Sequence, residues 1–234
     1  MNTPDTIVII PAAGQGKRMG VGKNKLFLSL GNETILECTL RKFLIHPRIK
    51  SIYLAIAKED EAEIRAMTQA MGEQIRLVYG GEERQDSVWN ALQVIRKESL
   101  PTWILVHDGA RPLFSHELID QILEACETCS AAVPVIPLKD TIRRRIENKS
   151  EIVDRSMLFA TQTPQGFRTE LLLQANDQAR KDGWKVTDDA SLVEHLGHDV
   201  AMIPGEETNI KITTPLDWKW GTWLAGSTKD DARF

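Results

Sequence analysis

The sequence predicts an α/β fold in which a doubly wound, mostly parallel sheet carries a projecting β-hairpin arm. Three observations predict it. Short apolar runs rich in β-branched residues alternate with stretches of helical periodicity, which is typical of parallel sheets. Several of the runs end in glycines or polar residues, as strands do where a doubly wound sheet binds ligands. One stretch, Pro137 to Phe159, breaks the rhythm with a strand–turn–strand pattern.

The first strand and its following loop are the most informative stretch. Ile7 to Ile10 are four β-branched residues in a row, as expected for a strand buried on both faces. Small residues follow at once: Pro11, Ala12, Ala13, Gly14 and Gly16. Such side chains let backbone N–H groups approach a ligand closely, and Lys17 and Arg18 add positive charge. We therefore expect a nucleotide here, the alternative being an ordinary glycine-rich turn.

Two common nucleotide motifs are excluded by their spacing. A dinucleotide fingerprint needs a third glycine where this chain has Met19, and Gly20 comes one place late. The Walker pattern of a glycine followed at fixed spacing by Gly-Lys-Ser/Thr does not occur. The loop is thus a different cradle, with its cations inside the loop.

The remaining elements follow in order along one expected domain, residues 1–234. The expected strands are Ser51–Ala57, Ile75–Tyr79, Trp103–His107, Ala131–Ile136, Val200–Pro204 and Asn209–Thr213. The expected helices are Thr34–Ile45, Glu59–Met71, one from Glu82 to about Lys97, Ser115–Cys129, one ending near Asp182, one capped by Thr187 to Ser191, and Asp217–Leu224.

The arm, residues 137–159, predicts self-association. Asp140 to Arg145 alternates loosely, turns near Asn148 and returns through Ile152 to Arg155. A two-stranded arm cannot bury its own apolar face, so we expect it to pack on a second subunit and make a homodimer.

Composition narrows the class of protein. The 234 residues carry a net charge of −4 with 26% charged residues, which argues against a nucleic-acid-coating surface, so basic residues beside motifs are read as local anion ligands. We find no apolar run near the roughly 18 residues that a membrane span needs, and Met1 to Thr6 is too short for a signal peptide. We expect a cytoplasmic protein without a membrane partner. Cys126 and Cys129 lack a second Cys/His pair for zinc and are expected to be plain thiols.

Five motifs in order resemble those of the 2-C-methyl-D-erythritol 4-phosphate cytidylyltransferases, over roughly residues 6 to 225. They are Pro11-Ala12-Ala13-Gly14-x-Gly16-x-Arg18-Met19, Gly80-Gly81-x-x-Arg84-x-Asp86-Ser87, His107-Asp108-x-Ala110-Arg111-Pro112, Thr161-x-Thr163-Pro164-Gln165 and Asn209-Ile210-Lys211-Ile212-Thr213. The resemblance implies a Rossmann-like nucleotidyltransferase fold. It also implies transfer of CMP from CTP to 2-C-methyl-D-erythritol 4-phosphate, giving 4-diphosphocytidyl-2-C-methyl-D-erythritol and pyrophosphate, in the non-mevalonate isoprenoid pathway.

The resemblance also assigns roles to residues. It implies that the catalytic residues, which act on the charge of the reacting phosphates, are Arg18, Lys25, Arg155 and Lys211. It implies that the nucleotide is bound by Pro11, Ala12, Ala13, Gly14, Gly16, Gly80, Gly81, Ser87, Asp108 and Gly109. Of these, Gly80, Gly81 and Ser87 are expected near the cytosine. It implies that the methylerythritol phosphate is bound by Arg111, Thr141, Arg155, Thr163, Thr187 and Lys211, with Thr141 and Arg155 entering the site of the neighbouring subunit. Mg²⁺ is the implied cofactor, with Asp108 and Asn209 as oxygen ligands.

Plainer interpretations stay open for several of these residues. Lys25 alone could be a solvated loop lysine, Asp86 a helix cap and Asp108 a turn aspartate. His107 is expected to be structural, because an attacking phosphate is already ionised and needs no general base. The chain also departs from the family where Asn24 and Leu26 flank Lys25, and where Gly109 stands in place of alanine and loosens the turn that presents Asp108.

Two other functions are weighed against this one. A ribitol 5-phosphate cytidylyltransferase would share the cytidine half of the site, but its first motif usually reads Leu-Ala-Gly-Gly instead of Pro11 to Gly14. A non-catalytic nucleotide-binding protein would be expected to have lost its cations, yet Arg18, Lys25, Arg155 and Lys211 are all present.

Overall fold

A central mixed sheet organises the computed structural model, which describes residues 5–14, 24–98 and 100–227. Within these residues the sheet has eight strands in the order β10-β7-β11-β6-β1-β4-β5, with β12 paired to β7. The strands are β1 (Thr6–Pro11), β4 (Ile49–Ile56), β5 (Ile75–Tyr79), β6 (Trp103–Val106), β7 (Ala131–Pro137), β10 (Phe159–Thr161), β11 (Gln165–Arg168) and β12 (Ala201–Pro204). A short hairpin, β2 (Ser29–Leu30) and β3 (Glu33–Thr34), lies apart from it.

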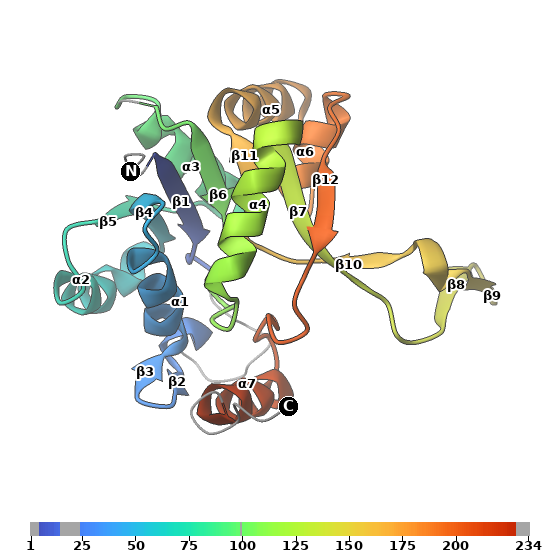
Figure 1. Ribbon diagram of the computed structural model, residues 1–234, viewed down its shortest axis with the longest axis horizontal. Helices are drawn as coiled ribbons and strands as arrows, with labels where there is room; N and C mark the ends of the chain where they lie inside the picture. The colour runs from blue at the N-terminus through green and yellow to red at the C-terminus, as the bar shows by residue number, and fades with distance from the viewer. Residues whose placement is uncertain (1–4, 15–23, 99, 228–234) are drawn as a thin grey trace.

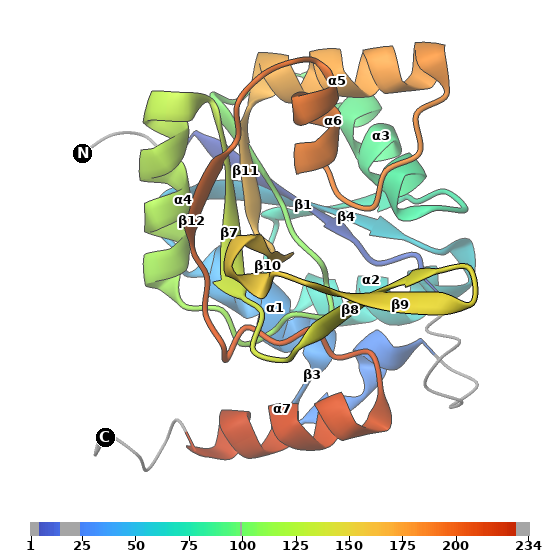
Figure 2. The same ribbon diagram turned by 90° about the vertical axis from the view of Figure 1, so that its right-hand side faces the viewer.

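Helices cover both faces of the sheet (Figures 1 and 2). They are α1 (Ile35–Leu44), α2 (Glu61–Gln69), α3 (Arg84–Ile95), α4 (His116–Cys129), α5 (Thr169–Asp182), α6 (Ala190–His195) and α7 (Pro215–Ser227). One apolar core receives side chains from α1, α2 and α4, and a second core on the opposite face receives them from α3, α5 and α6. The doubly wound fold predicted from the sequence is thus confirmed. No helix in the described ranges has the length and apolarity that a membrane crossing requires.

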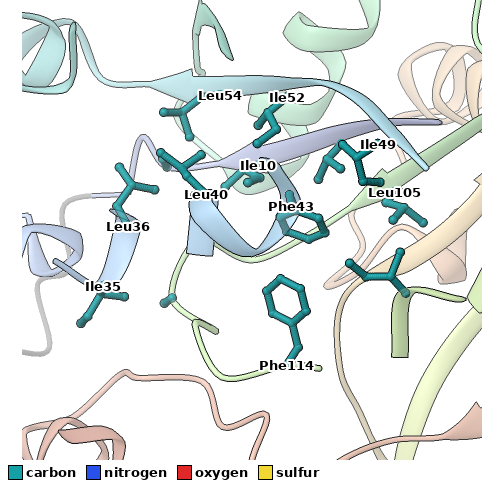
Figure 3. Close-up of a cluster of buried hydrophobic side chains, with 14 of the residues drawn as sticks. Ile10, Ile35, Leu36, Leu40, Phe43, Ile49, Ile52, Leu54, Leu105 and Phe114 are labelled. Atoms are coloured by element: carbon teal, nitrogen blue, oxygen red, sulfur yellow. The ribbon is translucent and has the colours of Figure 1, made fainter. Parts of the chain in front are cut away.

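Strand β1 lies between β4 and β6 and is parallel to both. Its side chains alternate between the two cores: Val8 and Ile10 enter one, and Ile7 and Ile9 enter the other. Figure 3 shows Ile10 beside Leu40 and Phe43 of α1. A run of four β-branched residues is therefore explained by burial on both faces, and it fixes the end of β1 at the middle of the sheet.

Helix α1 begins at a capping box that ties it to the site loops. The Thr34 hydroxyl accepts a hydrogen bond from the Glu37 N–H at 3.1 Å, and the Glu37 carboxylate accepts from the Thr34 N–H at 2.7 Å. One turn further, the Thr39 hydroxyl donates to the Gly109 carbonyl at 3.1 Å. The helix start thus positions a loop that follows β6.

The order of β6, β11 and β7 was not predicted. Strand β11 runs antiparallel to both of its neighbours, β6 and β7, and β10 runs antiparallel to β7. Gly166 permits this insertion, since a Cβ there would lie 2.4 Å from Ile122 Cγ2 of α4. The strand Gln165–Arg168 is only four residues long and precedes α5 directly, so its sequence reads as the start of a helix.

One expected strand is wrong. Asn209 to Thr213 forms no strand and runs as an irregular segment past the end of the sheet. Its alternating isoleucines resemble a strand because Ile212 is buried and Ile210 is half buried. The backbone makes one bond to the β6–α4 loop, from Ile212 N–H to the Ala110 carbonyl at 2.9 Å, in place of a ladder.

The predicted arm is present. Strands β8 (Ile142–Ile146) and β9 (Lys149–Val153) pair antiparallel as a separate two-stranded sheet. Figure 1 shows them projecting to the right of the central sheet. Apolar side chains on the arm face solvent, with Met157 80% and Ile152 63% exposed.

Candidate active site

A cavity of about 310 Å³ opens at the edge of the sheet where β1 and β6 end. It is lined by Pro11, Ala12, Ala13, Gly14, Lys25, Leu26, Gly81, Glu82, Glu83, Arg84, Ser87, Asp108, Gly109, Ala110, Lys211 and Thr213. Most of the residues expected to hold a nucleotide are thus brought together from three separate parts of the chain. Gly16 and Arg18 lie outside the described residues.

The turn before α3 is packed too tightly for any side chain at two positions. A Cβ on Gly80 would lie 2.5 Å from the Ala13 Cβ, and one on Gly81 would lie 2.2 Å from the Asp86 Cβ. The Ser87 hydroxyl accepts a hydrogen bond from the Gly81 N–H at 3.1 Å and holds the turn closed. The backbone of this turn therefore lies directly against the nucleotide loop.

Asp86 serves as a helix cap, which confirms the plainer of its two interpretations. Its carboxylate accepts from the Glu83 N–H at 3.1 Å in a capping box and forms an ion pair with Arg180 at 2.6 Å.

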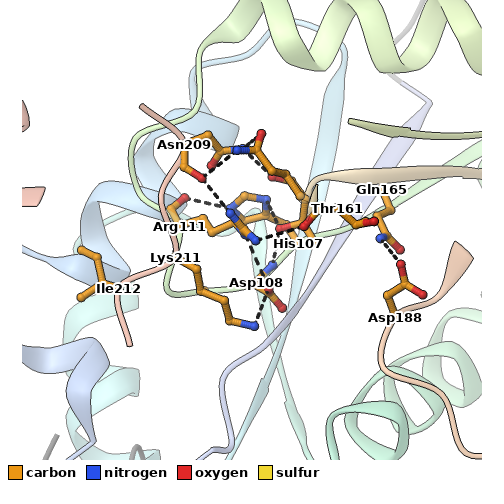
Figure 4. Close-up of polar contacts among 12 residues, drawn as sticks. His107, Asp108, Arg111, Thr161, Gln165, Asp188, Asn209, Lys211 and Ile212 are labelled. Atoms are coloured by element: carbon orange, nitrogen blue, oxygen red, sulfur yellow. Dashed lines mark hydrogen bonds and ion pairs between the residues drawn. The ribbon is translucent and has the colours of Figure 1, made fainter. Parts of the chain in front are cut away.

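Asp108 is the acidic centre of the site and is surrounded by cations. Its carboxylate oxygens lie 3.0 Å from Arg84 Nε, 2.8 Å from Lys211 Nζ and 3.7 Å from Arg111 Nε. Burial alone would raise the pKa of Asp108, but the charges of Arg84, Lys211 and Arg111 outweigh it and hold that pKa well below its usual range. Figure 4 shows the Lys211 ammonium directed at this carboxylate. Asp108 is therefore ionised, and the cationic side chains around it outnumber its single negative charge.

His107 and Thr163 fix the backbone of Asp108 from behind. The Asp108 N–H donates to the Thr163 hydroxyl at 3.0 Å, and that hydroxyl lies 3.2 Å from His107 Nδ1. His107 Nε2 lies 3.0 Å from the Arg111 carbonyl, which can only accept, so Nε2 carries the proton and Nδ1 accepts from Thr163. Complete burial lowers the pKa of His107 to about 3. The expected structural role of His107 is confirmed.

Arg111 and Thr163, both expected at the second substrate, bind backbone groups; Thr163 is buried and Arg111 is half-buried. Arg111 Nη1 donates to the Asn209 carbonyl at 2.7 Å, and its Nη2 donates to the Thr161 carbonyl at 3.4 Å (Figure 4). The Asn209 side-chain amide donates to the Thr163 carbonyl at 2.8 Å. These contacts join the Asn209–Thr213 segment to the loop after β6 and so place Lys211 at the cavity. Neither Arg111 nor Thr163 lines that cavity.

Lys25 enters the cavity from the first turn of the 3-10 helix η2 (Lys25–Phe27). Its Nζ donates to the Ile212 carbonyl at 2.7 Å. Asn24 caps this turn by accepting from the Leu26 N–H at 3.1 Å, and its amide donates to the Ala12 carbonyl at 3.2 Å and to Asp60 at 2.8 Å. Leu26 is buried in the core. The unusual neighbours of Lys25 therefore attach it to the nucleotide loop.

The backbone at Gly109 does not require a glycine. Its φ is not positive, and the Thr39 hydroxyl binds its carbonyl. A Cβ at this position would lie 3.3 Å from Ile10 Cγ2 and 3.4 Å from Leu26 Cδ1, which is close but possible with small shifts.

Three expected substrate residues lie away from the cavity lining. Thr141 and Arg155 are exposed on the arm, and Thr187 is exposed on the loop before α6. In the described part of the chain, the Arg155 guanidinium makes no hydrogen bond or ion pair, and its carbonyl accepts from the Leu158 N–H at 3.0 Å.

The arrangement does not fit direct binding of Mg²⁺ by Asp108 and Asn209. Both Asp108 oxygens already contact cationic side chains, and the Asn209 side chain is fully buried with its amide bonded to Thr163. Asn209 Oδ1 has no hydrogen-bond partner among the residues that the structure describes, but a single buried amide oxygen is a poor site for an ion that keeps several waters. Over the described ranges there is no cluster of three His, Cys, Asp or Glu side chains suited to a metal.

Two residues without an assigned role stand out in the structure, Arg84 and Asp189. Arg84 lines the cavity, and its Nη1 donates to Asp189 Oδ2 at 2.6 Å while its Nε bonds Asp108. Arg84 stood inside the glycine motif, so the sequence carried a signal for it. Asp189 is 2% exposed at its side chain, and nothing in its local sequence distinguishes it from the exposed acids nearby.

Comparison with known proteins identifies the family. Residues 6–223 match the model of the family described as 2-C-methyl-D-erythritol 4-phosphate cytidylyltransferase. A protein of that name from Bacillus velezensis is 48% identical over 215 residues, covering 90% of this chain and 91% of its own. One from Bacillus cytotoxicus is 44% identical over 213 residues, with 90% and 93% covered.

Solved structures agree. The 2-C-methyl-D-erythritol 4-phosphate cytidylyltransferase of Thermus thermophilus superposes with a TM-score of 0.78 at 38% identity, over 94% of this chain and 98% of its own. The 4-diphosphocytidyl-2C-methyl-D-erythritol synthase of Anaerococcus prevotii superposes with a TM-score of 0.84 at 29% identity, over 94% and 96%. Motifs, fold and relatives all lead to one conclusion: the chain belongs to the 2-C-methyl-D-erythritol 4-phosphate cytidylyltransferase family.

Proposed function

We propose that this protein transfers CMP from CTP to 2-C-methyl-D-erythritol 4-phosphate in the non-mevalonate isoprenoid pathway. An oxygen of the methylerythritol phosphate attacks the α-phosphorus of CTP, a new P–O bond forms, and the bond to the β-phosphate breaks to release pyrophosphate. The observation that carries the proposal is the single cavity lined by a side-chain-free glycine turn together with Lys25, Arg84 and Lys211. Such a site suits a base at one end and a triphosphate at the other.

The Gly80–Ser87 turn is proposed to read the base. Gly80 lies against Ala13 and Gly81 against Asp86, each with no room for a Cβ, so the backbone of this turn offers fixed donors and acceptors to a planar base. A site built to pair the cytosine amine leaves polar groups unpaired when it is offered uracil, which carries a carbonyl instead. We therefore expect strong preference for CTP over UTP.

Lys25 and Lys211 are proposed to stabilise charge in the transition state. Transfer between phosphates needs little covalent chemistry from a protein, so alignment and neutralisation of charge dominate the barrier. Lys25 Nζ and Lys211 Nζ are held by the Ile212 carbonyl and Asp108 respectively, and so are fixed before the substrates arrive. Arg18 is proposed to act with them. No side chain has to remove a proton, because the attacking phosphate is already ionised.

The second substrate is proposed to bind a site shared between two subunits. Thr141 and Arg155 do not line the cavity of their own chain, although Arg155 offers an exposed guanidinium suited to a phosphate. The arm that bears them exposes Met157 and Ile152, which need a covering surface. A two-fold dimer in which each arm reaches its neighbour satisfies both requirements. Thr187 and Lys211 are proposed to complete this half of the site, with Arg111 and Thr163 supporting it from behind.

Mg²⁺ and the cellular location belong to the same proposal. We propose that Mg²⁺ enters with the triphosphate, since this ion is commonly bound through substrate phosphates. A cytoplasmic location is supported by the free thiols of Cys38, Cys126 and Cys129, which suit a reducing compartment.

One assay separates this function from its alternatives. The protein is incubated with Mg²⁺, with CTP or UTP, and with methylerythritol phosphate or ribitol 5-phosphate, and pyrophosphate is measured. Release with CTP and methylerythritol phosphate is the expected result. Release only with ribitol 5-phosphate would support the related cytidylyltransferase, and CTP binding without any release would support a non-catalytic protein.

A further inference from the structure

Arg84 joins two parts of the site that are far apart in the sequence. Its Nε donates to Asp108 Oδ1 at 3.0 Å and its Nη1 donates to Asp189 Oδ2 at 2.6 Å. Asp108 follows β6 beside the nucleotide loop, and Asp189 ends the loop that carries Thr187. One guanidinium thus spans the nucleotide side and the second-substrate side of the proposed function, on which this inference rests.

The two carboxylates of this bridge are buried, and the Arg84 side chain between them is half-buried. The side chains of Asp189 and Asp108 are 2% and 10% exposed. Burial alone would lower the pKa of Arg84, but the two carboxylates outweigh it and raise that pKa above its ordinary value, so the side chain stays charged. Its third nitrogen, Nη2, is buried without a hydrogen-bond partner in the described residues. Leaving such a donor unpaired costs free energy. The other two contacts of the guanidinium, to Asp108 and Asp189, must therefore hold it in place.

The two carboxylates depend on Arg84 to different degrees. Asp108 has Lys211 and Arg111 as further cations. Asp189 has no other cation within ion-pair distance in the described ranges. The backbone around Asp189 is held separately, because Gln165 Oε1 accepts from the N–H groups of Asp189 and Ala190, each at 3.1 Å. Loss of Arg84 should therefore release the Asp189 side chain and loosen the loop at Thr187, while Gln165 still holds the N–H groups of Asp189 and Ala190.

We propose that Arg84 is a positioning residue for both substrates. Through Asp108 it sets the charge and orientation of the nucleotide side. Through Asp189 it holds Thr187 at the second-substrate side. A lysine cannot replace it, because one ammonium cannot present two donors in the planar fork that reaches both carboxylates.

The test is a set of steady-state measurements on Arg84→Gln, Asp189→Asn and the double variant, with the KM for each substrate determined separately. Arg84→Gln should raise both KM values about tenfold or more, the effect of losing a hydrogen bond to a charged group. Asp189→Asn should raise the KM for methylerythritol phosphate and leave that for CTP unchanged, since Asp108 keeps its three cations. The double variant should equal Arg84→Gln, because both changes break one link. Arg84→Lys should leave the KM for methylerythritol phosphate raised.

The controls distinguish positioning from loss of folded protein. Arg96→Lys alters an exposed ion pair with Asp177, 2.9 Å long and at the other end of α3, and should leave both KM values unchanged. If Arg84 had only a structural role, the apparent kcat would fall in proportion to the fraction of folded protein and both KM values would stay unchanged. That result would overturn the proposal. Additive effects of the two single substitutions would also overturn it. If Arg84→Gln fails to fold, the double variant lacks the unpaired buried carboxylate and supplies the comparison.

Failure of the proposed function is separable from failure of this inference. Calorimetry with CTP alone requires no turnover. If the wild-type chain binds CTP but uses no second substrate, a CTP Kd raised by Arg84→Gln would support the role of Arg84 and an unchanged Kd would overturn it.

Discussion

Two lysines make the same contact in different surroundings. Lys25 Nζ donates to the Ile212 carbonyl and Lys42 Nζ donates to the Phe114 carbonyl, each at 2.7 Å. Only Lys25 lines the cavity. Position decides its expected role, since an ammonium beside a charged phosphate stabilises a transition state and an identical one elsewhere does not.

The first prediction follows from this pair. Lys25→Ala should lower kcat on the order of 10²- to 10³-fold, the usual effect of removing one donor to developing charge. Lys42→Ala loses the same type of hydrogen bond and should keep its kcat within a few fold. Steady-state kinetics on both folded variants is the measurement. A Lys25→Ala enzyme that raised only the KM for CTP would assign this lysine to ground-state binding.

His107 makes the fold sensitive to acid. Its pKa is lowered from 6.5 to about 3 by burial. Between these values the unfolded chain binds a proton that the folded chain excludes, so the free energy of unfolding falls as the pH falls.

The second prediction compares slopes. Between about pH 4 and pH 6 the wild-type free energy of unfolding should fall more steeply than that of His107→Gln, by about 1.4 kcal/mol per pH unit for one proton. Urea unfolding over this range measures both slopes. Parallel curves would mean that His107 takes up a proton in the folded state.

Single residues also show what local sequence leaves undetermined. The sequence indicated that Lys25 faces the substrates but not that Asn24 bonds Ala12 and Asp60, because those partners are brought close only by the fold. Asp189 was unrecognisable for the same reason, since its contacts with Arg84 and Gln165 arise only when the fold brings these residues together. Arg84 was recoverable from its motif alone.

At the scale of elements, the glycine turn between β5 and α3 is the part most exposed to steric change. Gly80 is the point where the turn lies against the nucleotide loop, because a Cβ at this position would overlap Ala13 and Ser87. The role of these glycines was predictable from the sequence, because glycines directly after a strand of a doubly wound sheet are typical of a ligand-binding turn.

The third prediction tests this boundary. Gly80→Ala should lower the affinity for CTP roughly tenfold or more, because its Cβ would fall 2.5 Å from the Ala13 Cβ and 2.7 Å from the Ser87 hydroxyl. Gly226→Ala adds the same methyl group where no neighbouring atom of the described residues lies within 4 Å, and should leave the CTP affinity unchanged. Calorimetric titration with CTP measures both. Equal affinities would remove the turn from base recognition.

Elements failed to be predicted where tertiary contacts override local pattern. Asn209 to Thr213 alternates like a strand, yet the Arg111 side chain and the Ala110 carbonyl hold it as an irregular segment. Strand β11 was missed because four residues before a helix carry little periodicity. Longer elements such as β1 and α4 were predicted well, since their apolar pattern repeats over enough residues to be read alone.

At the scale of the whole molecule, the chain presents an incomplete second-substrate half and an arm without a surface to cover it. The Arg155 guanidinium lies on that arm without a hydrogen bond or ion pair to the described residues, and the cavity has no arm residue in its lining. The sequence predicted the arm from its strand–turn–strand pattern. It could not show that the arm stands clear of its own cavity, because that separation depends on how β7 and β10 leave the sheet.

The central claim, one active site built from two chains, is tested most directly by mixing inactive variants. Arg155→Ala and Lys25→Ala, each expected to be nearly inactive, are allowed to exchange subunits in equal amounts. About half of the dimers should be mixed with one good site of two, so activity should recover to about a quarter of wild type. As a control, Lys25→Ala mixed with Lys211→Ala should recover nothing, since both lysines line the same cavity of one chain. No recovery from the first mixture, with subunit exchange confirmed by mass, would show that Arg155 serves its own chain and would contradict the shared site.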